Sequence, residues 1–131
     1  MSLTVDASGF PAYWSGLVNE QKGEEVLDLY DPQATLLPTF SPNIAVGRVA
    51  LNAYFEGLLS RDSLCVTLHE ETVTIVQPAE SLAVVTGYYD FAYEDAGKLL
   101  THPSRFTFAL DLKQSAPILH HHSSQIPGAL S

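Results

Sequence analysis

The chain has 131 residues, a suitable length for one compact domain, and we expect residues 1–131 to form a single domain. Apolar residues make up 46% of it and charged residues 16%, a globular composition that argues against a disordered chain. Fifteen acidic against six basic side chains give a net charge of −9, which would repel nucleic-acid phosphates and anionic lipid surfaces. We therefore expect neither nucleic acid nor a membrane as a partner.

Cysteine usage and hydropathy bear on the compartment. Cys65 is the single cysteine, so no intramolecular disulfide can form, and a reducing compartment is the simpler expectation. No stretch approaches the ~18 to 20 consecutive apolar residues of a membrane-spanning helix. Residues 1–14 lack the basic and apolar regions of a signal peptide. We therefore expect a soluble, cytoplasmic protein.

In the first half of the chain, bulky side chains recur every three to four residues, the spacing that places them on one face of a helix. This spacing predicts helices over residues 10–18 and 48–59. Residues 24–30 form a shorter predicted helix, with acidic side chains in its first turn, where the helix dipole favours them. The apolar run 34–39, which contains Pro38 and is followed by a turn, predicts a short edge strand.

In the second half of the chain the hydrophobic period changes to two, which is typical of β-strands. The apolar positions of the long strand predicted over 64–75 change parity across Glu70–Glu71, which predicts a β-bulge and a bend. Further strands are predicted over 82–93, 99–113 and 118–126, joined by tight turns. This order favours an α+β fold in which three N-terminal helices pack on one face of a bent antiparallel sheet.

Four segments of the sequence carry a family resemblance. They are Leu29-Tyr30-Asp31-Pro32-Gln33-Ala34-Thr35-Leu36-Leu37-Pro38, Gly47 leading to Tyr54-Phe55, Ser104-Arg105-Phe106-Thr107-Phe108, and His120-His121-His122-Ser123-Ser124-Gln125-Ile126-Pro127. Together they resemble the association (hub) domain of calcium/calmodulin-dependent protein kinase II and its stand-alone bacterial relatives, over nearly the whole chain. The resemblance implies the nuclear-transport-factor-2-like (SnoaL-like) fold, a cone-shaped sheet wrapped around helices to leave a pocket. It implies no phosphoryl transfer, because the kinase half of that family has no counterpart here.

Arg105 is the first candidate for ligand binding. It alternates with Phe106 and Phe108 and therefore shares a strand face with Thr107 rather than with the apolar row. If that face lines the pocket, the guanidinium offers fixed donors to a carboxylate or carbonyl ligand. The alternative is an internal ion pair with an acid such as Asp90.

The three histidines of the last strand are the second group of candidates. His120 and His122 project to the same side and His121 to the other, although a turn of uncertain length leaves open which side faces inward. The hairpin geometry predicts His122 opposite Ala109 and a few residues from Arg105, so that one histidine and Arg105 line the same cavity. Such imidazoles could move protons, or simply hold the pocket wall by hydrogen bonds. No acid lies nearby in sequence to complete a metal site, and we expect no metal.

Trp14 and Tyr54 complete the predicted pocket, because their helices would close the cone and both combine a large apolar body with a polar tip. The alternative is that these aromatic residues, at helical spacing, are simply part of the hydrophobic core.

The first of two possible functions is a non-catalytic domain that associates with itself as a homodimer or higher oligomer and binds a small anionic or carbonyl ligand. We expect its subunit contact on an apolar strand face directed away from the helices, formed by Phe106, Phe108, Leu110 and Leu112. The alternative is a small cofactor-independent enzyme of the polyketide cyclase or ketosteroid isomerase type, with Asp90 or His122 as acid or base. Neither function requires a cofactor, and no Gly-rich dinucleotide motif is present.

Overall fold

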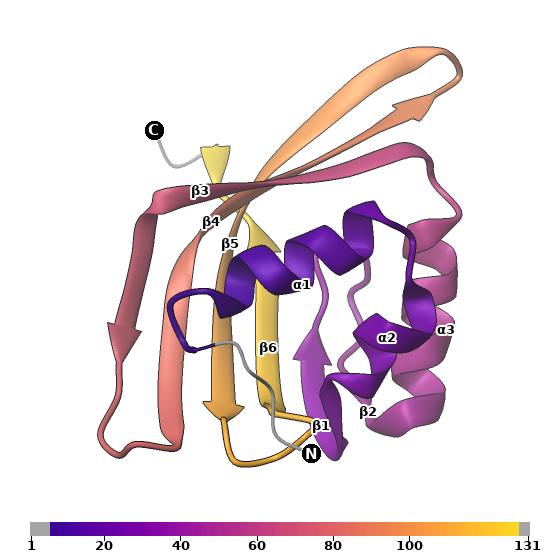
Figure 1. Cartoon of the computed structure of the whole chain (residues 1–131). Coiled ribbons are helices and arrows are strands. Elements are labelled where there is room, and N and C mark those ends of the chain that lie inside the picture. Colours follow the sequence, from indigo (N-terminus) through magenta and orange to yellow (C-terminus); the bar gives the residue numbers. More distant parts are fainter. Residues whose placement is uncertain (1–5, 129–131) are drawn as a thin grey trace.

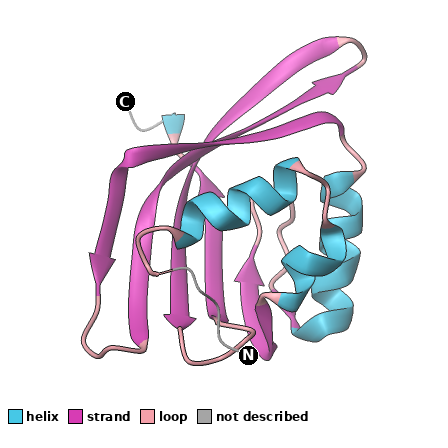
Figure 2. Cartoon of the chain, viewed as in Figure 1, coloured by secondary structure: helices cyan, strands magenta, loops and turns pink. Residues whose placement is uncertain are grey.

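A computed structural model describes residues 6–128, which form a bent sheet with helices on one of its sides (Figures 1 and 2). The helices are α1 (Phe10–Asn19), α2 (Gly23–Asp28) and α3 (Gly47–Leu59). The strands are β1 (Tyr30–Leu37), β2 (Ala45–Val46), β3 (Asp62–Val76), β4 (Leu82–Asp95), β5 (Lys98–Asp111) and β6 (Ile118–Gln125). The α+β class and the element order agree with the sequence prediction, except that the two-residue β2 is new. No helix of the described chain is long and apolar enough to cross a bilayer.

The six strands lie in the order β2-β1-β6-β5-β4-β3. All neighbours are antiparallel except β1 and β6, which run parallel, so the expectation of a wholly antiparallel sheet was wrong for this pair. A pairing between segments so far apart in sequence leaves no local signal. Strand β1 tolerates Pro32 because the β1–β6 register shifts between Tyr30 and Thr35, where the ladder does not need its missing N–H.

Strand β3 contains the predicted bulge. Its register against β4 shifts between His69 and Thr74. The hydroxyl of Thr72 fills the gap, donating to the His69 carbonyl at 2.6 Å and accepting from the Tyr88 N–H at 2.9 Å. Figure 1 shows the result: β3 crosses over α1 and then turns sharply to become the edge of the sheet.

The core lies between α1 and the inner face of the sheet. Phe108 is completely buried, with its ring centroid 5.3 Å from that of Phe10 and 5.8 Å from that of Trp14. Phe106 and Leu110 are buried beside it. The expectation that this apolar row faces away from the helices was therefore wrong. It is the most apolar face of β5, so burying it against the apolar side of α1 removes the most hydrophobic surface from water.

Candidate functional site

A buried chain of hydrogen bonds runs through the interior. The indole N–H of Trp14 donates to Tyr30 Oη at 3.1 Å, and Tyr30 Oη lies 2.8 Å from His121 Nδ1. On the other side of the imidazole, Nε2 lies 3.0 Å from Tyr89 Oη, which donates to Ser123 Oγ at 2.6 Å. Because the Tyr89 proton points to Ser123, its oxygen must accept from His121. The imidazole therefore carries its proton on Nε2 and accepts from Tyr30 at Nδ1.

Burial keeps this interior network uncharged. Desolvation lowers the pKa of His121 well below its ordinary value, and the neighbouring His120 and His122 lower it further. The same desolvation raises the pKa of Tyr30 and of Tyr89, and it raises the pKa of Tyr54 to about 12. His121 is thus a neutral imidazole held between two neutral phenols.

The interior leaves almost no space for a ligand. One cavity of about 10 Å³ adjoins His121 and Ser123, with Trp14 and Tyr54 among its walls. That volume holds roughly one water molecule. Trp14 and Tyr54 thus lie at the predicted interior, but the core around them is filled.

The larger hollow lies on the outer face of the sheet and has a volume of about 370 Å³. Arg105 and His122 line it together with Thr86, Thr107 and Tyr88. Outside it, His120 is half-buried, with Nδ1 2.7 Å from Thr35 Oγ1 and 3.1 Å from the Thr35 carbonyl oxygen. The five residues expected in one pocket are therefore divided: two inside the core, two in the outer hollow and one beside Thr35.

The hairpin register differs from the prediction by two residues. His122 pairs with Thr107, and Ala109 pairs with His120 rather than with His122. The turn between β5 and β6 closes one residue earlier than expected, which shifts the pairs from Ser104–Gln125 to Ala109–His120 by two. A shift of two keeps the strand faces, so His122 stays on the side of Arg105, and it brings the two residues closer.

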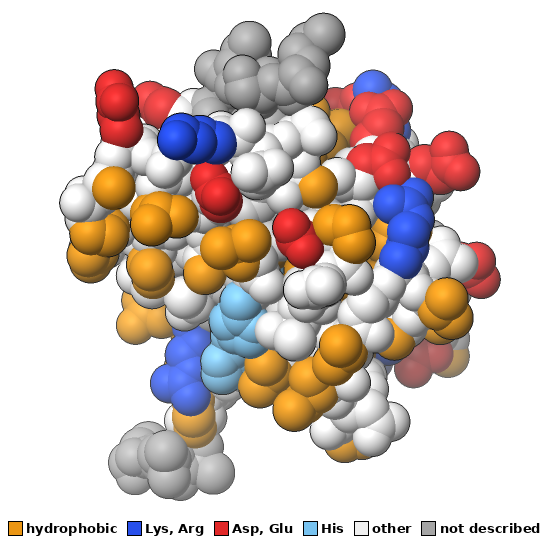
Figure 3. Space-filling view, turned by 90° about the horizontal axis from the view of Figure 1, so that it is seen from below, with side chains coloured by type: hydrophobic (Ala, Val, Ile, Leu, Met, Phe, Trp, Pro, Cys, Tyr) orange, Lys and Arg blue, Asp and Glu red, His pale blue; other side chains and the backbone are white. Residues whose placement is uncertain are grey.

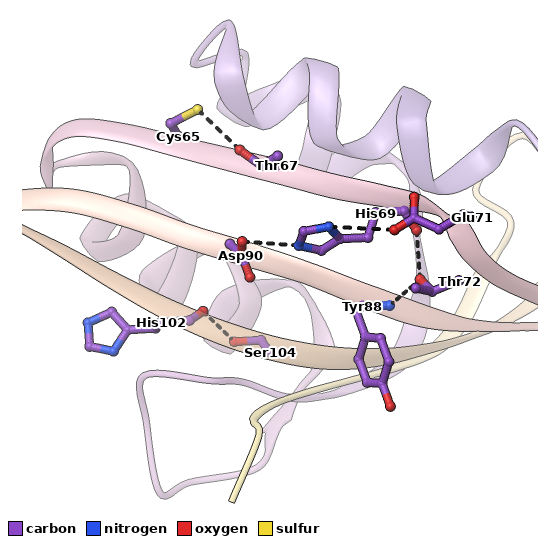
Figure 4. A network of polar contacts seen from close by, with 9 residues as sticks. All are labelled: Cys65, Thr67, His69, Glu71, Thr72, Tyr88, Asp90, His102 and Ser104. Carbon is purple, nitrogen blue, oxygen red and sulfur yellow. Dashed lines mark hydrogen bonds and ion pairs between the residues drawn. The ribbon is translucent and has the colours of Figure 1, made fainter. Parts of the chain in front are cut away.

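Arg105 has no acidic partner among the described residues. Its Nε donates to Ser124 Oγ at 3.3 Å, and the side chain is exposed. The ion pair with Asp90 considered from sequence does not form, because the Asp90 carboxylate binds His69 Nε2 at 3.0 Å. Figure 4 shows this pair, with Glu71 3.9 Å from the other ring nitrogen of His69.

Sequence reasoning missed two polar groups. For the His69–Asp90 pair, a signal existed in the strand parity, since His69 alternates with the buried Leu64 and Val66 and the partly buried Leu68 and so points outward. The interior network gave no comparable signal, because it joins α1, β1, β4 and β6 through contacts as distant in sequence as Tyr30 and His121.

The sequence matches the family of the calcium/calmodulin dependent protein kinase II association domain over residues 12–127. The chain belongs to this family. A crystal structure assigned to the same association domain, from Xanthomonas campestris, is 27% identical, with a TM-score of 0.82 over 98% of this chain and 94% of that one. No curated protein matches the sequence.

Two more distant structures show the fold. An NTF2-like protein with a cystatin-like fold from Novosphingobium aromaticivorans is 14% identical, with a TM-score of 0.72 over 92% of this chain and 80% of that one. The epoxide hydrolase/cyclase-like enzyme SalBIII, which acts in pyran ring formation in salinomycin, is 13% identical, with a TM-score of 0.74 over 89% and 88%. This association-domain protein therefore has the nuclear-transport-factor-2-like fold that the sequence predicted.

Proposed function

We propose that this protein is a self-associating domain without kinase activity, which pairs with a second copy through the outer face of its sheet. The observation that carries the proposal is a row of directly paired residues crossing all six strands on that face. The row consists of Val76, Val84, Ala109, His120, Thr35 and Val46. Val76 is 62% exposed, Val46 61% and Val84 39%. Apolar side chains exposed in such a row on a sheet favour an isologous contact.

The arrangement of charge supports the same face. The row itself contains no acidic residue, although the chain carries a net charge of −9. Figure 3 views the molecule from the end where β3 stops and β4 starts. Toward the bottom of this view, hydrophobic side chains lie beside histidine and basic side chains, and the acidic side chains lie mainly toward the top and the right. A second copy that meets the hydrophobic part of the surface avoids the repulsion between two acidic surfaces.

Sedimentation velocity at micromolar concentration tests this contact. We expect the wild type to sediment as a dimer or larger assembly of the 14.3 kDa chain, and Val76→Glu and Val84→Glu to sediment as monomers. Val49→Glu is the matched control, because Val49 is 88% exposed on α3, away from the sheet. A monomeric wild type would overturn the proposal, as would two glutamate variants that assemble like the control.

We further propose that the outer hollow binds a small anionic or carbonyl ligand at Arg105. A guanidinium without an acidic partner, at the wall of a 370 Å³ hollow, is suited to a carboxylate. Calorimetry with cyclohexanecarboxylate tests this ligand: we expect the wild type to bind it and Arg105→Gln not to bind it. Equal binding by both proteins would show that Arg105 does not bind the carboxylate.

We also propose a cytoplasmic location, with which the exposed, free Cys65 is compatible.

A small cofactor-independent enzyme is the alternative function. The observation that favours it is the neutral His121 between Tyr30 and Tyr89, an imidazole and two phenols joined by hydrogen bonds beside a small cavity. The earlier candidates Asp90 and His122 lie on the outer face instead. The enzyme requires the small cavity to open to a substrate. Cyclohexanone or phenol would then shift the NMR resonances of the His121 ring, whereas unchanged resonances would exclude these ligands from the interior.

A further inference from the structure

Several polar groups in the outer hollow have no partner within residues 6–128. The hydroxyls of Thr86 and Thr107, the imidazole of His122 and the phenol of Tyr88 make no side-chain hydrogen bond there, and Arg105 makes only its bond to Ser124. Inside the core, by contrast, each polar group of the His121 network is paired. These unpaired donors and acceptors thus line one and the same hollow.

These groups are ordered by the strands that carry them. Thr74 pairs with Thr86, Thr86 with Thr107, and Thr107 with His122, so that four polar side chains form one line across β3, β4, β5 and β6. Neighbouring strands lie about 4.8 Å apart, which makes this threonine row roughly 14 Å long. Arg105 lies two residues further along β5, or about 7 Å from the row.

Gly87 and Tyr88 also line the hollow. At Gly87, an added Cβ would lie 2.9 Å from Phe106 Cζ and 3.1 Å from Thr72 Oγ1, so no larger residue fits there without displacing its neighbours. Tyr88 is 47% exposed. An exposed aromatic ring beside hydroxyl groups offers one apolar surface and several hydrogen bonds to the same ligand.

We infer that the hollow recognises a polyhydroxylated carboxylic acid, such as a sugar acid, with the carboxylate on Arg105 and the hydroxyls along the threonine row. This inference rests on the proposed ligand role of Arg105 and adds the chemical class of the ligand. One guanidinium matches one carboxylate, whereas a phosphate group in a chain of net charge −9 would need further cations that the hollow does not supply. Threonine hydroxyls and an imidazole, which donate and accept, match the hydroxyls of a sugar.

Three probes separate the two halves of the ligand in calorimetric titrations. D-galacturonate carries both the acid and the hydroxyls, D-galactose only the hydroxyls, and cyclohexanecarboxylate only the acid. We expect the wild type to bind galacturonate more tightly than either of the other two. Thr86→Val and Thr107→Val keep the side-chain shape and remove one hydroxyl each, and each should weaken galacturonate binding about three- to tenfold while leaving cyclohexanecarboxylate unchanged. Arg105→Gln should abolish the preference for galacturonate over galactose.

Two further variants control for indirect effects. Thr86→Ser keeps the hydroxyl and should retain the affinity for galacturonate. Thr101→Val changes an exposed threonine of β5 outside the hollow and should have no effect. If cyclohexanecarboxylate binds as tightly as galacturonate and the valine variants match the wild type, the threonine row has no role although the ligand role of Arg105 stands. If the wild type binds none of the three probes, both proposals fail.

Discussion

Replacing Tyr89 by phenylalanine tests the interior hydrogen-bond network. Tyr89 is fully buried, and its ring packs against those of Trp14 and Phe106, with centroids 5.7 and 4.7 Å away. Tyr89→Phe keeps these ring contacts and removes only the hydroxyl. The change leaves the Nε2–H of the buried His121 without its acceptor and takes one donor from Ser123.

The expected decrease in the unfolding free energy of Tyr89→Phe follows from the hydrogen-bonding groups that lose their partner. A buried donor left without a partner costs about 1–3 kcal/mol. Ser123 keeps its hydrogen bond to Thr39, so the second loss is small. A water entering the adjoining cavity would recover part of the cost, which places the expected destabilisation near 2 kcal/mol. For a chain of this length that corresponds to a fall in Tm of roughly 6–10 °C.

Urea unfolding followed by tryptophan fluorescence measures this difference, with Tyr13→Phe as the control. Tyr13 is 37% exposed, so loss of its hydroxyl should change the unfolding free energy by less than about 0.5 kcal/mol. In the wild type, ¹⁵N chemical shifts of His121 should report the proton on Nε2, and in Tyr89→Phe this tautomer should lose its preference. If Tyr89→Phe unfolds at the same urea concentration as Tyr13→Phe, the network does not contribute to stability as argued.

Two other perturbations follow from buried groups. His121 stays neutral in the fold, whereas an unfolded imidazole takes up a proton near pH 6.5, so the unfolding free energy is fully present above that pH and falls below it by about 1.4 kcal/mol per pH unit. His121→Phe should flatten this dependence in urea titrations between pH 7 and 5, and an unchanged slope would assign it to other groups. Gly87→Ala should cost about 1–3 kcal/mol in thermal unfolding, because the new Cβ overlaps the Phe106 ring. A Tm equal to that of the wild type would show that Phe106 moves aside freely.

Local periodicity predicted the elements of this fold and failed where distant segments meet. The parity change at Glu70–Glu71 predicted the bulge because side-chain alternation is a property of one strand. The same alternation placed Arg105 and Phe106 on opposite faces of β5, but it could not show which face packs against the helices. The hydrophobicity of the two faces could have shown it, since Phe106, Phe108 and Leu110 are more hydrophobic than Arg105, Thr107 and Ala109.

The sequence predicted which residues line cavities, but it did not predict that they are divided between the two sides of the sheet. Arg105 and His122 share the outer hollow because they share a strand face, which alternation and a hairpin suffice to predict. Trp14 and Tyr54 belong to the opposite side of the sheet, and their separation from Arg105 depends on which face the helices cover. The role of His121 depends on Tyr30 and Tyr89, which contact it from other strands. The sequence pattern of β6 alone therefore could not predict this role.

The His121 network inside the sheet and the polar groups of the outer hollow differ in how fully they are hydrogen-bonded. Inside, Tyr30, Tyr89 and Ser123 complete the hydrogen bonds of His121, so that the interior is stable without a ligand and nearly full. Outside, three features follow one another at steps of two residues along β5: the row from Val76 to Val46 that contains Ala109, the threonine row, and Arg105. A second copy that covers the exposed valines of the first row gains hydrophobic contact, whereas the guanidinium beyond the threonine row gains most from a carboxylate. Assembly and ligand binding therefore draw on different rows of the same face, and a substitution in one row is able to change one property without the other.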